Sequence, residues 1–254
     1  MAVFPAASLA FVGGMLTGSF VGVVAHRVPR GLSIVGPRSE CDSCGAQIAA
    51  YDNVPVISWL MLRGRCRSCD AAIPARYPLV ELAVGAAFAA TAIVLRHDAA
   101  QLALGLLFVA MLAAITLTDL ERRIIPNTIL LAGAVAAVAL VATTDPSSFP
   151  ERGIAAAGAG GLLLVFGLAY PRGMGMGDVK LAAVMGLYLG SAVAPAILVA
   201  VLAGTIVGAG LLLSRGSGAR KAAVPFGPFL ALGGVIGLLA GDQLIDWYLN
   251  AFVR

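Results

Sequence analysis

Charged residues are scarce in this chain of 254 residues: Asp, Glu, Lys and Arg together make up 12%. A soluble globular domain carries about 25%, so this much charge cannot cover a water-soluble fold of the same size. Apolar residues reach 60%, which excludes an intrinsically disordered chain, because disordered chains are polar. The net charge of +4 is too small to indicate binding to nucleic acid. What remains is a polytopic membrane protein.

Cysteine is scarce as well, with four residues in the whole chain. That number is too low for a small fold held together by disulfides. The four are not scattered, however. They form two close pairs, and this grouping is more typical of a metal site than of disulfide bridges.

Long apolar segments are plentiful, and a helix needs about 20 apolar residues to cross the hydrocarbon core of a membrane. We predict an all-α polytopic membrane protein with about eight transmembrane helices and a small cytoplasmic zinc-binding insertion after the first helix. The predicted parts are a first helix (1–25), the insertion (26–77) and a seven-helix membrane domain (78–254). The eight predicted spans are Phe4–Ala25, Pro78–Leu95, Ala100–Thr118, Asn127–Ala142, Gly153–Tyr170, Val179–Leu189, Val193–Leu213 and Phe226–Leu249.

Glycines recur at intervals of four within some spans. Small residues at this spacing share one helix face and let two helices approach closely. An alternative is that glycine is simply common in membrane helices. The two longest series are Gly14, Gly18 and Gly22 in the first span and Gly233, Gly237 and Gly241 in the last.

The basic residues give the orientation. The first span has no basic residue before it, and Arg27 and Arg30 follow it directly. The positive-inside rule therefore places the N-terminus outside and 26–77 in the cytoplasm. With eight alternating spans, 14 of the 17 basic residues fall on the cytoplasmic side. The three on the outer side are Arg96, Arg152 and Arg254.

The cysteines lie in the predicted cytoplasmic insertion as Cys41-x-x-Cys44 and Cys66-x-x-Cys69, with 21 residues between the pairs. Two such pairs can hold one Zn²⁺ in a tetrahedral site of four thiolates. The reducing cytoplasm favours metal binding over disulfides. Four thiolates leave no open position on the metal, so the predicted zinc is structural. A redox pair or unrelated free cysteines remain as alternatives.

Two aspartates stand out because ionisable residues next to long apolar runs are costly. Asp119 ends the third predicted span, and Asp178 begins the sixth. On the predicted topology both lie at the cytoplasmic interface. Two carboxyl groups that face each other can share a proton, so that one activates water while the other protonates a carbonyl. Taken singly, Asp178 could be a helix cap and Asp119 a loop charge paired with Arg122 or Arg123.

Other residues near these aspartates fit a peptide-binding site. Gly173, Gly175 and Gly177 leave room for an extended peptide to lie against the backbone. Glu121 is a rival to Asp119 and an acidic partner for a basic substrate. Glu81, near the start of the second span, is a further costly carboxylate, and we expect a structural role for it with Arg76 or Tyr77 as its partner.

The chain resembles the bacterial prepilin peptidases, the type IV leader peptidases among the GxGD membrane aspartic proteases. The matching blocks follow one another along nearly the whole chain. They are Gly18-Ser-Phe with His26-Arg27-Val-Pro29, the tetracysteine segment, Arg76-Tyr77-Pro78-Leu-Val-Glu81, Asp119 with Ile125-Pro126-Asn127, Gly175-Met-Gly177-Asp178-Val-Lys180, and Pro225-Phe-Gly-Pro228.

The resemblance implies an enzyme of the bacterial inner membrane with Asp119 and Asp178 as its catalytic residues. Such enzymes cleave the basic leader of type IV prepilins and pseudopilins after a glycine, and many methylate the new N-terminal residue with S-adenosylmethionine. No methyl-donor motif is recognisable in the sequence. Gly175, Gly177, Lys180 and Glu121 are the predicted substrate-binding residues.

Two other functions compete with this one. A transporter could use paired carboxylates as a proton relay, although it would need them near the middle of the bilayer. A non-catalytic assembly protein could bind a partner through the cysteine segment, but this would leave the Gly-x-Gly-Asp block without a role.

Overall fold

The computed structural model describes residues 3–170, 174–215 and 225–252, and all of the long elements in these ranges are helices. Gly173 and Arg254 of the sequence analysis lie outside them. The chain divides into two compact units, Met1–His97 and Asp98–Arg254, which are described separately.

The first unit contains two long helices, α1 (Val3–Arg27) and α3 (Arg76–Val94), with the cysteine segment and the short helix α2 (Ile57–Met61) between them. The helices α1 and α3 pack along each other at their glycines. A Cβ added to Gly14 would lie 2.8 Å from the Cα of Gly85, and one added to Gly18 would lie 2.9 Å from the Cα of Glu81. The close approach expected from the spacing is confirmed at Gly14 and Gly18, whereas Gly22 has only an ordinary contact.

Glu81 is buried on α3 and has a structural partner. Its Oε2 accepts a hydrogen bond from the backbone N–H of Val56 at 2.7 Å. Glu81 is therefore bonded to a main-chain group just before α2, which agrees with the structural role expected for it. Val56 has a positive φ of 62°, which is costly for a β-branched residue, so Glu81 stabilises an unfavourable turn of the cysteine segment.

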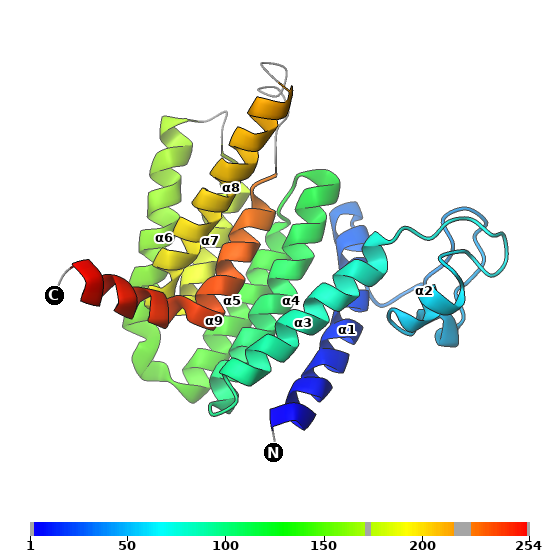
Figure 1. The fold of residues 1–254 in the computed structure, drawn as a ribbon, viewed down its shortest axis with the longest axis horizontal. Helices are drawn as coiled ribbons and strands as arrows, with labels where there is room; N and C mark the ends of the chain where they lie inside the picture. The colour runs from blue at the N-terminus through cyan, green and yellow to red at the C-terminus, as the bar shows by residue number, and fades with distance from the viewer. Residues whose placement is uncertain (1–2, 171–173, 216–224, 253–254) are drawn as a thin grey trace. The chain divides into compact units, whose positions relative to one another are not determined.

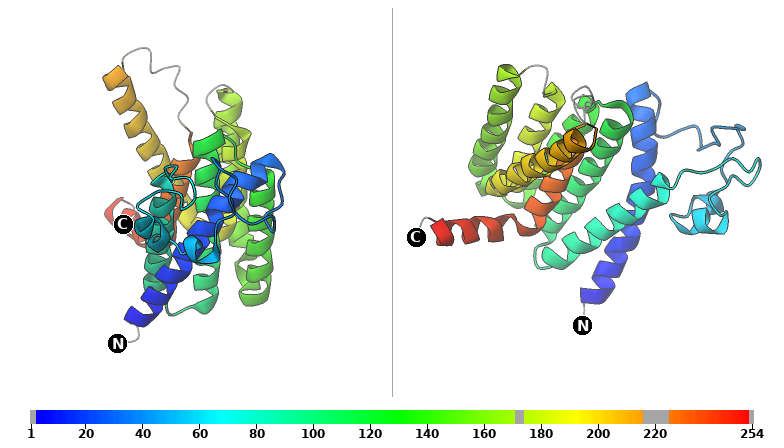
Figure 2. Two further views of the ribbon diagram at one scale, coloured as in Figure 1. Left: turned by 90° about the vertical axis from the view of Figure 1, so that its right-hand side faces the viewer. Right: turned by 45° about the horizontal axis from the view of Figure 1, so that its top comes forward.

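The second unit is a bundle of six helices (Figure 1). The helix α6 packs along α7, and α8 packs along α9 (Figure 2). A core of buried apolar side chains, among them Phe108, Ile115, Leu181 and Leu230, joins them. The six helices are α4 (Ala99–Arg122), α5 (Asn127–Thr144), α6 (Phe149–Ala169), α7 (Met176–Leu189), α8 (Val193–Arg215) and α9 (Gly227–Phe252).

Seven segments of the described chain are long and apolar enough to span a membrane. The sixth, Met176–Ser214, has 39 residues and contains both α7 and α8. The turn Gly190–Ala192 separates these two helices, and α8 leads back toward the end at which α7 begins (Figure 1). The seven segments therefore hold eight long helices, and the predicted all-α membrane fold is confirmed.

The glycines of α9 also bring helices together. Added Cβ atoms on Gly233, Gly237 and Gly241 would lie between 2.1 and 2.8 Å from atoms of Ala196 or Ala192. A larger residue at any of the three would push α9 away from α8 and from the turn before it. Close packing is thus the physical reason for these glycines.

Candidate active site

Asp119 lies in the last turn of α4 and is buried, with 6% of its surface exposed. The helix starts at a good cap, because the Asp98 side chain accepts hydrogen bonds from the N–H groups of Ala100 and Gln101, both at 2.9 Å. It ends at Arg123, whose left-handed φ of 55° stops the helix just after Asp119. The cap and the stop together fix Asp119 at one end of the bundle.

The carboxylate of Asp119 is held by the start of α9. Its Oδ2 accepts the backbone N–H of Gly227 at 2.9 Å, across 108 residues of chain. A Cβ on Gly227 would lie only 2.7 Å from this same oxygen, so any other residue here would displace the carboxylate. Sequence reasoning placed Gly227 in a matching block but gave it no role. The sequence feature that could have indicated a role is the single glycine between Phe226 and Pro228.

Asp178 lies in the first turn of α7 and is also buried, with 8% exposed. Its Oδ2 accepts the N–H of Gly175 at 3.2 Å, and its own N–H donates to the Gly175 carbonyl at 3.1 Å. The N-cap of α7 is Gly175, so Asp178 is not the simple N-cap considered above; its side chain instead bonds back to the N-cap from the third helical position. This hydrogen bond uses Oδ2 of Asp178. Within the described residues, Oδ1 accepts no hydrogen bond and so is available to bind water or substrate.

Asp119 is in the last turn of α4, and Asp178 is in the first turn of α7. The C-terminal end of α4 and the N-terminal end of α7 lie at the same end of the second unit (Figure 1). The start of α7 also packs against the segment just after α4, at Ile125. No buried side-chain N or O atom among the described residues lacks a hydrogen-bond partner. The fold thus brings together two buried carboxyls from segments 59 positions apart in sequence.

Gly177 packs against the segment that follows α4. A Cβ on Gly177 would lie 2.9 Å from the Cβ of Ile125, so glycine is needed here for helix packing whether or not a substrate touches it. Gly175 is exposed beside Asp178. Of the two glycines, Gly175 is the one whose surface is open to a peptide.

Lys180 is exposed, and its ammonium donates to the side-chain carbonyl of Asn127 at 3.0 Å. This bond joins α7 to the start of α5 and links the two motifs that the sequence analysis singled out. Glu121 is exposed in the last turn of α4, two residues beyond Asp119. Both side chains lie near an aspartate in sequence, but neither is buried with the pair.

The four cysteines form a separate cluster in the first unit. Their Sγ atoms all lie within 4.8 Å of one another, and Cys41 Sγ is 3.8 Å from Cys69 Sγ. Zinc bound tetrahedrally with Zn–S bonds of about 2.3 Å would place its sulfurs about 3.8 Å apart. Both the donor set and the spacing therefore fit zinc.

The two cysteine pairs adopt the same local fold. Cys41 N–H donates to Ala46 O at 2.9 Å, and Cys66 N–H donates to Ala71 O at 2.8 Å. The residue after each pair has a left-handed backbone, with φ of 70° at Gly45 and 57° at Asp70. Hydrogen bonds from the backbone of Ser43 and Cys44 lower the pKa of the Cys41 thiol to about 7. Each pair is therefore a preformed turn that directs two sulfurs to one point.

Two families match the chain. Residues 12–95 match the Bacterial Peptidase A24 N-terminal domain, and residues 106–213 match the Type IV leader peptidase family. No solved structure shows a significant match.

Similar proteins cover nearly the whole chain. The prepilin leader peptidase/N-methyltransferase of Aeromonas hydrophila is 36% identical over 282 residues, which is 97% of this chain and 94% of that protein. The protein of the same name from Bacillus subtilis is 34% identical over 247 residues, or 96% of this chain and 98% of that protein. That from Pseudomonas aeruginosa is 35% identical, over 93% and 91% of the two chains.

Proposed function

Because this chain belongs to the type IV leader peptidase family, as a prepilin leader peptidase/N-methyltransferase, we propose that Asp119 and Asp178 are its two catalytic residues. The observation that carries this proposal is the pair of buried carboxyl groups at one end of the second unit, each held by a backbone N–H. The family membership leaves no reason to retain a transporter or a non-catalytic assembly protein as the function.

The chemistry follows from two carboxyl groups that share one proton. The ionised carboxylate removes a proton from water, and the oxygen of that water forms a bond to the scissile carbonyl carbon. The protonated carboxyl gives its proton to the carbonyl oxygen. Collapse of this gem-diol intermediate breaks the C–N bond. The leaving nitrogen takes up the proton held by the first carboxylate, and one hydroxyl of the intermediate returns a proton to the second, so both carboxyl groups regain their starting states. The bonds from Gly227 and Gly175 orient the two groups for these transfers.

The substrates are prepilins, and we propose that pseudopilins are processed in the same way, after a glycine and at the cytoplasmic face. The peptide would lie extended over the exposed Gly175, next to the partly buried Gly177, with Lys180 beside it. Glu121, exposed next to Asp119 in the last turn of α4, would pair with a basic residue of the leader. The distribution of basic residues supports an outside N-terminus and a cytoplasmic active site in the inner membrane.

We also propose that Cys41, Cys44, Cys66 and Cys69 hold one structural Zn²⁺, as the 3.8 Å sulfur spacing supports. Bound zinc would cross-link the two cysteine turns and so fix the fold of 26–77. For methyl transfer we propose S-adenosylmethionine as the donor. The proposed methyl donor is supported by the name of the similar enzymes, and no methyl-donor motif in the sequence adds to it.

The experiment that tests the function uses the full chain in proteoliposomes and a synthetic prepilin with a basic leader, a glycine and an apolar helix. Mass spectrometry of the products should show a single cut directly after the glycine. The mass of one methyl group should be added to the new N-terminus only when S-adenosylmethionine is present. An uncut prepilin, or a cut at another bond, would refute the proposed activity.

A further inference from the structure

A cavity of about 300 Å³ lies at the C-terminal end of α1, wholly within the first unit. One wall is the last part of α1, with Phe20, Val23 and Arg27. The other walls come from the chain between α1 and α2. Neither Asp119 nor Asp178 is among the residues that line it. The residues between α1 and α2 that line the cavity are Ile34, Val35, Pro37, Arg38, Ser39, Ile48, Ala50 and Asn53.

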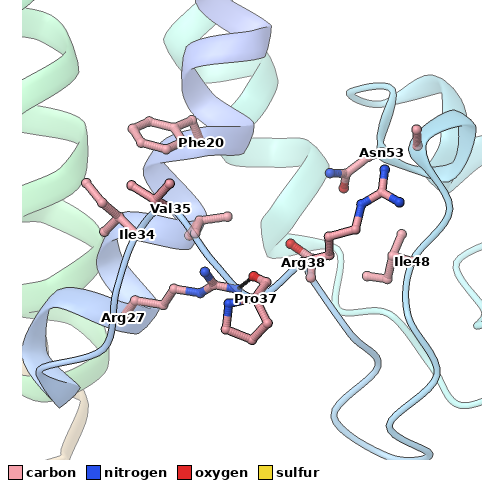
Figure 3. A pocket seen from close by; sticks show the side chains of 11 residues that line it. Phe20, Arg27, Ile34, Val35, Pro37, Arg38, Ile48 and Asn53 are labelled. Carbon is pink, nitrogen blue, oxygen red and sulfur yellow. Dashed lines mark hydrogen bonds between the residues drawn. The ribbon is translucent and has the colours of Figure 1, made fainter.

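The charge of the cavity is one-sided, because two arginines and no acidic residue line it. Arg27 is already engaged. Its guanidinium donates to the carbonyls of Ser33 at 3.0 Å and Pro37 at 2.6 Å, and so fixes the loop (Figure 3). Arg38 has no hydrogen bond or ion pair with any described residue, although its side chain lines the cavity. An arginine in this state is suited to a phosphate or a carboxylate, and it would repel a basic leader.

One side of the cavity is apolar and exposed, although Ser39 and Asn53 add polar groups to the lining. Phe20, Ile34 and Val35 gather on one side of it, and Arg38, Ile48 and Asn53 lie on the other (Figure 3). Within the described chain Phe20 is 50% exposed, Ile34 42% and Val35 94%. A small soluble anion would satisfy Arg38 but would leave this apolar surface in water. The cavity therefore fits a ligand that has an anionic head and an apolar tail.

The position of the cavity identifies the source of such a ligand. The candidate span that contains α1 runs from Phe4 to Arg30. Phe20 and Arg27 are seven residues apart, which is about 10 Å along a helix, so the cavity occupies the last part of the span. At that depth a membrane presents lipid headgroups and the upper parts of acyl chains.

We propose that this cavity binds the headgroup of an anionic phospholipid. Arg38 pairs with the phosphate, and the acyl chains lie along Phe20, Ile34 and Val35. The bound lipid ties the loop after α1 to the membrane surface. That loop continues into the first cysteine turn through the hydrogen bond from Ile48 N–H to Ser39 O at 2.8 Å, so the lipid also anchors the cysteine segment.

The test is a native mass spectrometry titration of the delipidated full chain with phosphatidylglycerol and with phosphatidylcholine. The wild type should bind phosphatidylglycerol more tightly. Arg38→Gln should weaken that binding roughly fivefold, the value expected for one basic residue at a membrane surface. Arg63→Gln is the matched control, because Arg63 is an exposed arginine of the same segment outside the cavity, and it should leave the affinity unchanged.

A second variant separates a lipid from a soluble anion. Val35→Asn keeps the charge of the cavity and should also weaken phosphatidylglycerol binding. Inorganic phosphate and S-adenosylmethionine, each added to the wild type, should not displace the lipid. Equal losses in Arg38→Gln and Arg63→Gln would overturn the proposal, because they would indicate general attraction. Displacement by phosphate or by the methyl donor would overturn it as well, because the cavity would then be a site for a soluble anion.

Discussion

At the scale of single residues, backbone N–H groups hold the two aspartates: Gly175, three residues away, bonds to Asp178, and the distant Gly227 bonds to Asp119. The sequence alone predicted a functional role for Asp119 and Asp178, because carboxylates beside long apolar runs are costly. It could not identify Gly227 as the partner of Asp119, since that contact spans 108 residues. It also gave Gly177 a role in substrate binding, whereas the packing of Ile125 gives a second physical reason for this glycine.

Gly227→Ala should lower the rate of leader cleavage about 100-fold, the order of loss expected when a reacting group moves by about 1 Å. The added Cβ would lie 2.7 Å from Asp119 Oδ2 and would force the carboxylate to move. Initial rates in proteoliposomes measure this. The matched control is Gly208→Ala, because Gly208 has nothing within 4 Å of its missing Cβ. Equal rates for both variants would show that Gly227 does not position Asp119.

At the scale of elements, the apolar runs predicted the long helices to within a few residues, and Gly190 marked the break between α7 and α8. The packing of charged side chains could not be predicted. Arg152 was assigned to an outer loop, yet it is buried in α6 with 8% exposed. Its guanidinium donates to the carbonyls of Leu187 at 2.9 Å and Tyr188 at 2.7 Å. It therefore caps the end of α7 opposite to Asp178.

Arg152→Gln should lower the melting temperature of the protein by several degrees. Each buried carbonyl left without a partner costs about 1–3 kcal/mol, and about 1 kcal/mol shifts the melting temperature of a chain this size by about 2–4 °C. Thermal unfolding in detergent measures the change. Arg96→Gln removes the same charge from an exposed arginine whose only hydrogen bond within the described residues is to the carbonyl of Ile93, and it should have little effect. A similar melting temperature for both variants would contradict the capping role.

The two cysteine turns are the other element that the sequence predicted in detail, because the spacing of Cys-x-x-Cys pairs defines the turn. We expect one zinc ion per chain by elemental analysis. Cys44→Ser should lose the metal and make 26–77 more sensitive to limited proteolysis, whereas Ser43→Ala, which alters the same turn but no ligand, should keep it. Zinc retention should fall as the pH is lowered, because protons compete for the thiolates. Wild-type protein without zinc, and with four freely alkylated thiols, would exclude this site.

At the scale of the whole molecule, the sequence predicted the number of helices, and the orientation predicted from the basic residues would put both aspartates on one side of the membrane. It could not supply the packing that completes the site. The ends of α4, α7 and α9 come together because apolar side chains from all three helices share one core. The central claim is that this assembly makes Asp119 and Asp178 one catalytic unit.

The most direct test is the initial rate of leader cleavage by Asp119→Asn, Asp178→Asn and the double variant, with Glu121→Gln as the neighbouring carboxylate control. Each aspartate variant should lose at least about 100-fold, the smallest usual contribution of general acid–base catalysis. The double variant should be no slower than the slower single variant, because the two groups act as a unit, and Glu121→Gln should still cleave. A near-normal rate in either aspartate variant, or an active Asp119→Asn beside an inactive Glu121→Gln, would contradict the assignment.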